Sequence, residues 1–283
     1  MESSKPHIAM VSSPGVGHLV GDLELGNRLV ADQNFKVTFF VVLEHHITVG
    51  ESKLIQSAKA QKLLHIVELP PVDLFGQLEP NAPVFTHLTA IMHEIKATLQ
   101  FAISSLKPST SVLVIDAFGT PVLDVVTDEF HMLKYVFVGC GWPLALMLYS
   151  PILDKEIEGE YVDQKEPIKL LGCMPLRPED ILVPMTDCTK HEYYFFLEVA
   201  SKMRKSDGIL MNSWEALDAV TLKAIREEDD YRSTPVYTVG PLIKSGGPPA
   251  LSLWLDEQPL DSVLYIAFGS LGVVSAKQIT KLA

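Results

Sequence analysis

The chain has 283 residues, of which 47% are hydrophobic and 20% are charged, a composition typical of a folded protein and not of a disordered one. Its 23 basic and 35 acidic residues give a formal net charge of −12, which argues against a nucleic-acid partner because a nucleic-acid-binding surface must be basic. The three cysteines, Cys140, Cys173 and Cys188, form no C-x-x-C pair, so we expect a reduced, cytoplasmic chain. The polar N-terminus and the glycine- and proline-interrupted apolar runs lead us to expect no membrane partner.

Short apolar runs alternate with longer segments of helical periodicity. Strands are predicted over residues 7–11, 36–42, 64–68, 112–115, 135–138, 208–211 and 236–239. Helices are predicted over residues 19–31, 46–60, 84–106, 121–130 and 190–204, and another is predicted to open at Asn212 or Ser213 as its cap. Because strands and helices alternate and the strands are apolar throughout, the pattern indicates an α/β fold, a doubly wound parallel sheet with helices on both faces.

A stretch rich in proline and glycine follows the last of these strands. We therefore predict a domain over residues 1–240, a linker over residues 241–261 and the first βα unit of a second domain over residues 262–283. In that unit a strand is predicted over residues 263–268, with a helix beginning near Ser275. A single βα unit cannot bury both of its faces, so we expect the rest of its domain to be missing or supplied elsewhere.

His18 follows the first predicted strand, after the glycine-rich turn of residues 13–17 and at the start of a helix. This position puts its side chain at the carboxyl edge of the sheet, where open α/β sheets bind ligands. The positive end of the helix dipole disfavours imidazolium, so the pattern predicts a neutral histidine that serves as a general base. The alternative is a solvated loop histidine that contacts nothing.

Asp116 ends the strand predicted over residues 112–115 and therefore lies at the same edge as His18. If the two strands are neighbours, its carboxylate can accept the Nδ1 proton of His18 and stabilise the imidazolium. The alternative is that Asp116 caps the helix that begins near Gly119. Gly15 and Gly17 do not make a dinucleotide-binding fingerprint, because Val20 stands where the third glycine is needed. No spacing of histidine or cysteine indicates a metal site.

Aromatic residues follow the ends of the same two strands. Phe118 lies two residues after Asp116, and Trp142 and Tyr149 follow the strand predicted over residues 135–138. They either line an aromatic pocket at the sheet edge or belong to the core. Cys140 is either a nucleophile or, as the lack of a nearby base favours, a small residue in a tight turn.

Six segments together resemble the plant secondary-product UDP-glycosyltransferases, with most likeness to the hydroquinone and monolignol glucosyltransferase group. In family order they are SPGVGHL (residues 13–19), VIDAFG (114–119), NSWE (212–215), VGP (239–241), WLD (254–256) and SVLYIAFGS (262–270). The resemblance covers nearly the whole chain. It implies a two-domain GT-B enzyme, of which this chain carries the N-terminal Rossmann-like domain and the start of the C-terminal one.

The resemblance also implies the chemistry. His18 deprotonates the hydroxyl of a small phenolic acceptor, Asp116 orients His18, and the oxygen attacks a UDP-sugar, expected to be UDP-glucose, with inversion. Gly17 and Ser270 match positions near the diphosphate of this co-substrate, and neither a tightly bound cofactor nor a metal is expected. The acceptor cleft is expected to be lined by Pro14, Phe118, Trp142 and Tyr149.

The chain also departs from the family. The sugar-donor box with its His-Cys-Gly-Trp-Asn-Ser core is absent, and Gly21 followed by Asp22 stands where the family tends to have proline. We therefore expect UDP-sugar to bind weakly if at all in this form, and a C-terminal half or a full-length homologue to be a partner. The alternative is a naturally truncated protein without sugar transfer that acts as a small-molecule binder, an interaction partner or a different histidine-dependent enzyme.

Overall fold

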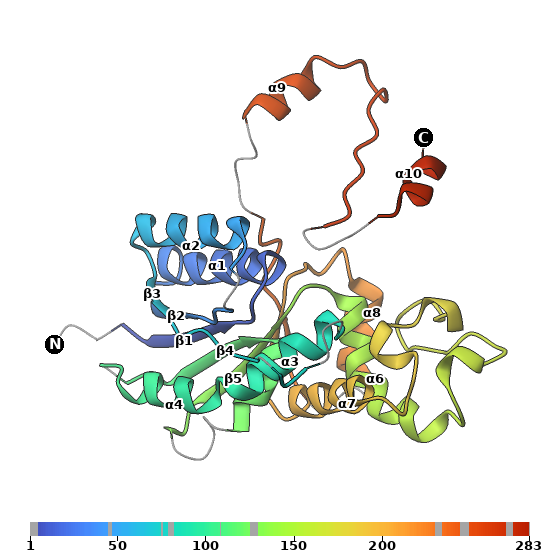
Figure 1. Cartoon of the computed structure of the whole chain (residues 1–283), viewed down its shortest axis with the longest axis horizontal. Coiled ribbons are helices and arrows are strands. Elements are labelled where there is room, and N and C mark those ends of the chain that lie inside the picture. The colour runs from blue at the N-terminus through green and yellow to red at the C-terminus, as the bar shows by residue number, and fades with distance from the viewer. Residues whose placement is uncertain are drawn as a thin grey trace.

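One sheet of seven parallel strands organises the chain (Figure 1). The computed structural model describes residues 5–44, 47–74, 76–78, 82–107, 109–124, 130–229, 234–243, 249–269 and 274–282. The strands are β1 His7–Ser12, β2 Lys36–Val41, β3 His65–Glu68, β4 Val112–Asp116, β5 Leu133–Val138, β6 Gly208–Met211 and β7 Val236–Thr238. Their order is β3-β2-β1-β4-β5-β6-β7, so the direction of winding reverses between β1 and β4. This is the predicted doubly wound sheet, and ligands bind such sheets at the reversal point.

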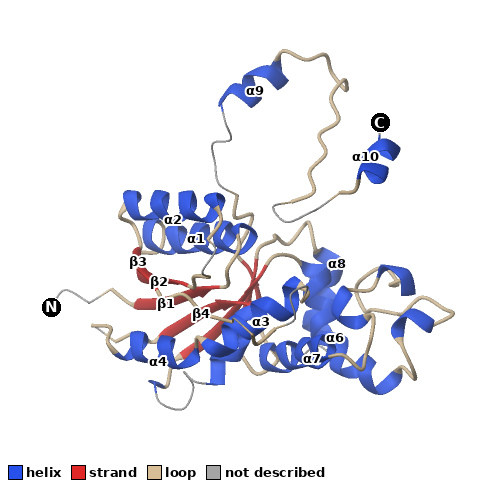
Figure 2. Cartoon of the chain, viewed as in Figure 1, coloured by secondary structure: helices blue, strands red, loops and turns tan. Residues whose placement is uncertain are grey.

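Helices cover both faces of the sheet (Figure 2). They are α1 Val16–Ala31, α2 Val49–Gln61, α3 Val84–Glu94, α4 Lys96–Ser104, α6 Gly141–Glu156, α7 His191–Met203, α8 Ala219–Glu227, α9 Pro249–Asp256 and α10 Ala276–Leu282. The described residues also contain the 3₁₀ turns η1 Ala117–Val122, η2 Tyr161–Asp163, η3 Pro178–Asp180 and η4 Val183–Met185. In Figure 1, α1 and α2 lie on one side of the sheet, and α3 and α4 lie on the other.

The sheet separates two hydrophobic clusters. Ile8 and Met10 of β1 pack with residues of α1 and α2, whereas Ala9 and Val11 pack with residues of α3, α4, α6 and α7. Successive side chains of a strand point to opposite faces, so a strand covered on both sides is apolar at nearly every position; the buried polar Thr38 of β2 is hydrogen-bonded to His7. This explains the unbroken apolar runs of the sequence.

Two predicted helices differ from the structure. The helix predicted over residues 84–106 is divided into α3 and α4 at the buried residue Ile95, and this division lets α3 pack against η1 and α7. In the segment predicted as a helix over residues 121–130, η1 carries Pro121 inside it, and residues 125–129 lie outside the described part.

The predicted helix cap at Asn212 or Ser213 is wrong, because both side chains bind elsewhere. Asn212 Oδ1 accepts a hydrogen bond of 2.7 Å from the backbone N–H of Leu242, and Ser213 donates to Asp218. The helix α8 begins later, at Ala219, after Asp218.

The strand predicted over residues 263–268 is also absent from the structure. This segment has no neighbouring strand among the described residues, and Leu264 is 82% exposed. A strand depends on hydrogen bonds to a neighbour, so an apolar, β-prone run without one remains extended and unpaired. The division into domains at residues 240 and 261 stays a prediction. None of the described helices is both long enough and apolar enough to cross a membrane.

The two faces of α4 offer a test of the core. We expect Leu99→Ala to lower the free energy of unfolding by about 2–5 kcal/mol, because Leu99 is 0% exposed and its loss leaves a cavity. Phe101→Ala, on the same helix but 77% exposed, is the control and should change it by less than about 0.5 kcal/mol. Urea denaturation of both variants measures the difference, and equal effects would contradict the packing described here.

Candidate functional site

The carboxylate of Asp116 joins two turns at the reversal point of the sheet. Asp116 ends β4, which lies beside β1, and its Oδ2 accepts a 3.0 Å hydrogen bond from Ser13 N. Its Oδ1 accepts hydrogen bonds from Ser13 Oγ at 2.7 Å and from Gly119 N at 2.8 Å. Asp116 therefore does cap η1, and it also holds the turn that leads into α1.

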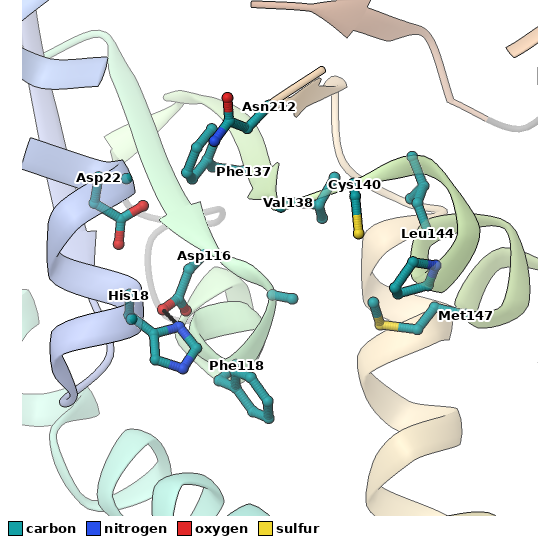
Figure 3. A pocket seen from close by; sticks show the side chains of 15 residues that line it. His18, Asp22, Asp116, Phe118, Phe137, Val138, Cys140, Leu144, Met147 and Asn212 are labelled. Atoms are coloured by element: carbon teal, nitrogen blue, oxygen red, sulfur yellow. Dashed lines mark ion pairs between the residues drawn. The ribbon is translucent and has the colours of Figure 1, made fainter. Parts of the chain in front are cut away.

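His18 lies in the first turn of α1, with its Nδ1 3.1 Å from Asp116 Oδ2 (Figure 3). The Asp116 side chain is buried and His18 is largely so. Within the described residues Nε2 of His18 has no hydrogen-bond partner, so this nitrogen can accept a proton from a ligand. The sequence alternatives for Asp116, a cap or a partner of His18, are not exclusive, because its two oxygens serve both.

The charge of Asp116 decides the protonation of His18. Burial alone lowers the pKa of His18, but the hydrogen bond and charge of Asp116 outweigh it and leave this pKa raised. In return, although burial raises the pKa of Asp116, the hydrogen bonds and charge of His18 and Ser13 leave it lowered. The helix dipole, which was expected to favour the neutral form, is therefore outweighed by the carboxylate in contact, and the net effect on the pKa of His18 is upward.

Asp22 is a second carboxyl group beside this pair. It lies one helical turn after His18, is 3% exposed, and its Oδ2 has no hydrogen-bond partner among the described residues. Burial, together with the charge of Asp116, raises the pKa of Asp22 well above its usual value, against the effect of a hydrogen bond from Ser12. In the sequence, Asp22 stands out only as a departure from the family, although its four-residue spacing from His18 puts it on the same face of the helix.

The turn between β1 and α1 is held from its other side by Glu51 of α2. Gly15 has a φ of 114°, which a residue with a Cβ rarely adopts. Its N–H donates to Glu51 Oε1 at 2.8 Å, and Oε2 of the same carboxylate accepts hydrogen bonds from Thr48 N and Oγ1. Both sides of the turn are thus bound by carboxylates, which positions His18.

Two cavities meet at His18. The smaller, of about 290 Å³, is lined by Gly17, His18, Gly21, Asp22, Asp116, Ala117, Phe118, Phe137, Val138, Gly139, Cys140, Pro143, Leu144, Met147 and Asn212 (Figure 3). The larger, of about 780 Å³, is lined by Pro14, Gly15, Val16, His18, Glu44, Thr48, Gly50, Glu51, Ala82, Val84, Phe85, His87, Leu88 and Phe118. The Phe118 ring lies edge-on to His18 with 5.1 Å between centroids, and Phe85 lies 5.4 Å from Phe118. Aromatic surface therefore adjoins the imidazole.

The structure separates the predicted site residues. Gly17 lines the smaller cavity, Pro14 the larger and Phe118 both. Tyr149 lies in the core instead, and Trp142 packs against it; neither is among the residues that line these two cavities. The reason is the phase of α6, which turns residues 143 and 147 toward the smaller cavity and residues 142 and 149 toward the core. Ser270 lies outside the described residues.

Cys140 lines the smaller cavity, as a residue at the end of β5 should. Burial and the charge of Asp218 raise the pKa of its thiol. A nucleophilic cysteine needs a lowered pKa, so the environment favours the interpretation as a small residue in a turn. Among the described residues no cluster of three histidine, cysteine, aspartate or glutamate side chains could hold a metal ion.

Sequence reasoning missed several residues of the larger cavity, namely Glu44, Phe85 and His87. Glu44 follows the end of β2, so the rule that ligands bind at carboxyl edges could have found it. Phe85 and His87 lie in the first turn of α3, whose approach to this edge depends on tertiary packing.

Comparisons with known proteins agree with this architecture, although no family model matches the chain. It is 42% identical to anthocyanidin 3-O-glucosyltransferase 5 of Manihot esculenta and 35% identical to hydroquinone glucosyltransferase of Rauvolfia serpentina. These matches cover 99% and 98% of the chain but 59% and 60% of the relatives. The chain thus spans about three fifths of the length of these relatives.

Solved structures show the same relationship. TcCGT1 in complex with UDP matches with a TM-score of 0.85 and 40% identity, over 98% of this chain and 60% of that one. Phytolacca americana UGT2, complexed with UDP-2fluoro-glucose and pterostilbene, matches with a TM-score of 0.90 and 29% identity, over 100% and 64%. The curated relatives and the structural neighbours are thus plant UDP-glycosyltransferases, and this chain corresponds to their N-terminal half.

Proposed function

We propose that this chain forms the acceptor-binding and catalytic-base half of an inverting UDP-glycosyltransferase that transfers a sugar, in the first place glucose, to a hydroxyl of a small phenolic. The observation that carries the proposal is the His18–Asp116 pair, with 3.1 Å between Nδ1 and Oδ2, in which His18 lines both cavities. This pair leaves Nε2 of His18 available for the proton of an acceptor.

In this mechanism the imidazole acts as the base. Nε2 of His18 takes the proton of the acceptor hydroxyl while the Nδ1–H remains hydrogen-bonded to Asp116. The acceptor oxygen forms a bond to the anomeric carbon of the UDP-sugar, and the bond from that carbon to the diphosphate oxygen breaks, so UDP leaves with the electron pair. The carboxylate of Asp116 fixes the tautomer and stabilises the imidazolium that forms.

The substrate classes follow from the cavities and the relatives. The edge-on Phe118 and the adjoining Phe85 offer an aromatic surface to a planar ring beside His18. The names of the relatives are those of glucosyltransferases, and one neighbouring structure contains a UDP-sugar analogue together with pterostilbene. UDP-sugar is a co-substrate here, and its binding is proposed to need a C-terminal half or a full-length homologue.

Removal of the base tests the proposal. We expect His18→Ala to reduce kcat/KM about 10²–10⁴-fold, the usual cost of losing a general base. Asp116→Asn should cost less, because the base survives while its orientation weakens. The measurement is glucoside formation by the chain joined to the C-terminal part of the Manihot esculenta relative. Equal and small losses in both variants would show that His18 is not the base.

The pH dependence of His18 gives a second prediction. Because Asp116 raises the pKa of His18, Asp116→Asn should lower it, since burial then acts unopposed by that charge. Catalysis needs neutral His18, so the rate should rise with pH through this pKa, and in Asp116→Asn the rise should move to lower pH. NMR titration of His18 in the isolated chain measures the shift directly. A His18 pKa that is unchanged or higher in Asp116→Asn would contradict the pairing.

The isolated chain should bind UDP-glucose poorly. Of the two residues that the resemblance puts near the diphosphate, Gly17 lines the smaller cavity and Ser270 lies outside the described residues. Calorimetry is expected to show no saturable binding at micromolar concentrations of UDP-glucose, with the joined protein of the preceding experiments as positive control. A micromolar Kd, which corresponds to about −8 kcal/mol, would mean that this half holds the donor by itself.

A further inference from the structure

The larger cavity contains a histidine–carboxylate contact that the transfer reaction does not use. Glu44, just beyond β2, and His87, in the first turn of α3, both line it, with His87 Nε2 3.1 Å from Glu44 Oε2. Their side chains are 30% and 42% exposed, so a molecule in the cavity can reach them. This pair lies in the same cavity as His18 but belongs to different elements.

Glu44 has unused capacity to accept a hydrogen bond. Its Oε2 is bound by His87, whereas its Oε1 has no partner in the described part of the chain. Glu51, the other carboxylate of the cavity, differs because Gly15 and Thr48 occupy both of its oxygens. Glu44 is therefore the carboxylate that can receive a ligand hydroxyl, and His87 holds it in place.

Apolar side chains also line this cavity, in addition to His18 and the Glu44–His87 pair. Val84, Phe85, Leu88 and Phe118 contribute apolar surface to the same cavity. Ligand sites combine mostly apolar walls with a few placed polar groups that determine orientation. A cavity with a base and a separate carboxylate fits a ligand that carries two polar groups on an apolar frame.

We propose that Glu44 and His87 form a second recognition point for the acceptor, which is an aromatic alcohol with a further neutral hydroxyl away from the one that His18 deprotonates. This inference rests on the proposed function, because it assumes that the cavity holds the acceptor. The carboxylates of Glu44 and Glu51 repel a negative charge on the ligand, so phenolics that bear a carboxylate are disfavoured. Glu44 accepts the hydrogen bond of the second hydroxyl, and His87 is a positioning residue.

Matched probes test this on the 283-residue chain itself. The two-ring set is 4-hydroxybiphenyl, biphenyl-4,4′-diol and 4′-hydroxybiphenyl-4-carboxylate; the one-ring set is phenol, hydroquinone and 4-hydroxybenzoate. Calorimetry gives the affinities, and the NMR signals of His18 report whether each probe occupies the cavity. The variants are Glu44→Ala and Glu44→Gln. The control is Glu24→Gln, on α1, where Glu24 pairs with Arg28 and lines neither cavity.

A symmetric diol can present either hydroxyl to His18, which by itself makes it bind about twofold more tightly than the mono-ol, a statistical factor. In the set whose length fits the cavity we expect a further preference of about tenfold, because hydrogen bonds to charged groups are strong. Glu44→Ala should reduce this preference to the statistical factor. Glu44→Gln should improve the binding of the carboxylate probe relative to the mono-ol. Glu24→Gln should leave both ratios as in the unchanged chain.

The possible failures are distinguishable. If no probe perturbs His18, the cavity is not the acceptor site and the proposed function itself is wrong. If the probes bind at His18 but the diol preference is absent or survives Glu44→Ala, the second recognition point is overturned and the proposed function stands. Tighter binding of the carboxylate probe than of the diol would overturn it as well. Urea denaturation of each variant confirms that lost binding is not lost folding.

Discussion

The carboxylate of Asp116 receives hydrogen bonds from two turns that lie more than a hundred residues apart, and it pairs with His18. A buried charge is costly unless it is paired and hydrogen-bonded. Here the partners are Ser13, Gly119 and His18, so the same contacts hold both turns and the imidazole in position. The pairing of β1 with β4 brings these turns together. The geometry of the site therefore depends on one side chain at the point where the sheet reverses its winding.

Two carboxyl groups near the same imidazole show how local contacts decide charge. Asp116 has hydrogen-bond donors on both oxygens, and its pKa is lowered. Asp22 is equally enclosed, yet one oxygen has no partner among the described residues, and its pKa is raised. Burial acts on both in the same direction, so the number of donors and the nearness of the cation make the difference. Neighbouring carboxyl groups of equal burial therefore have pKa values shifted in opposite directions.

Local rules predicted much of this structure and failed where contacts are distant. Alternating apolar runs indicated the parallel sheet, and the rule of carboxyl edges brought His18 and Asp116 to the same place, although their chemical roles remain proposals. Trp142 and Tyr149 were assigned to a cleft because they follow a strand, but the phase of α6 turns them toward the core. The Glu44–His87 contact joins residues 43 positions apart, which no local pattern encodes. The segment over residues 263–268 has the composition of a strand and lacks a neighbour.

That segment has a practical consequence. Val263, Leu264, Tyr265, Ile266 and Phe268 are all exposed, and the segment lies with α9 and α10 away from the sheet (Figure 1). Residues 263–268 are uncharged, contain no proline and have no strand partner among the described residues, and such a run is a template for pairing between molecules. We therefore expect concentrated solutions of this 283-residue chain to self-associate through residues 263–268, and a charged substitution in that run to weaken the association.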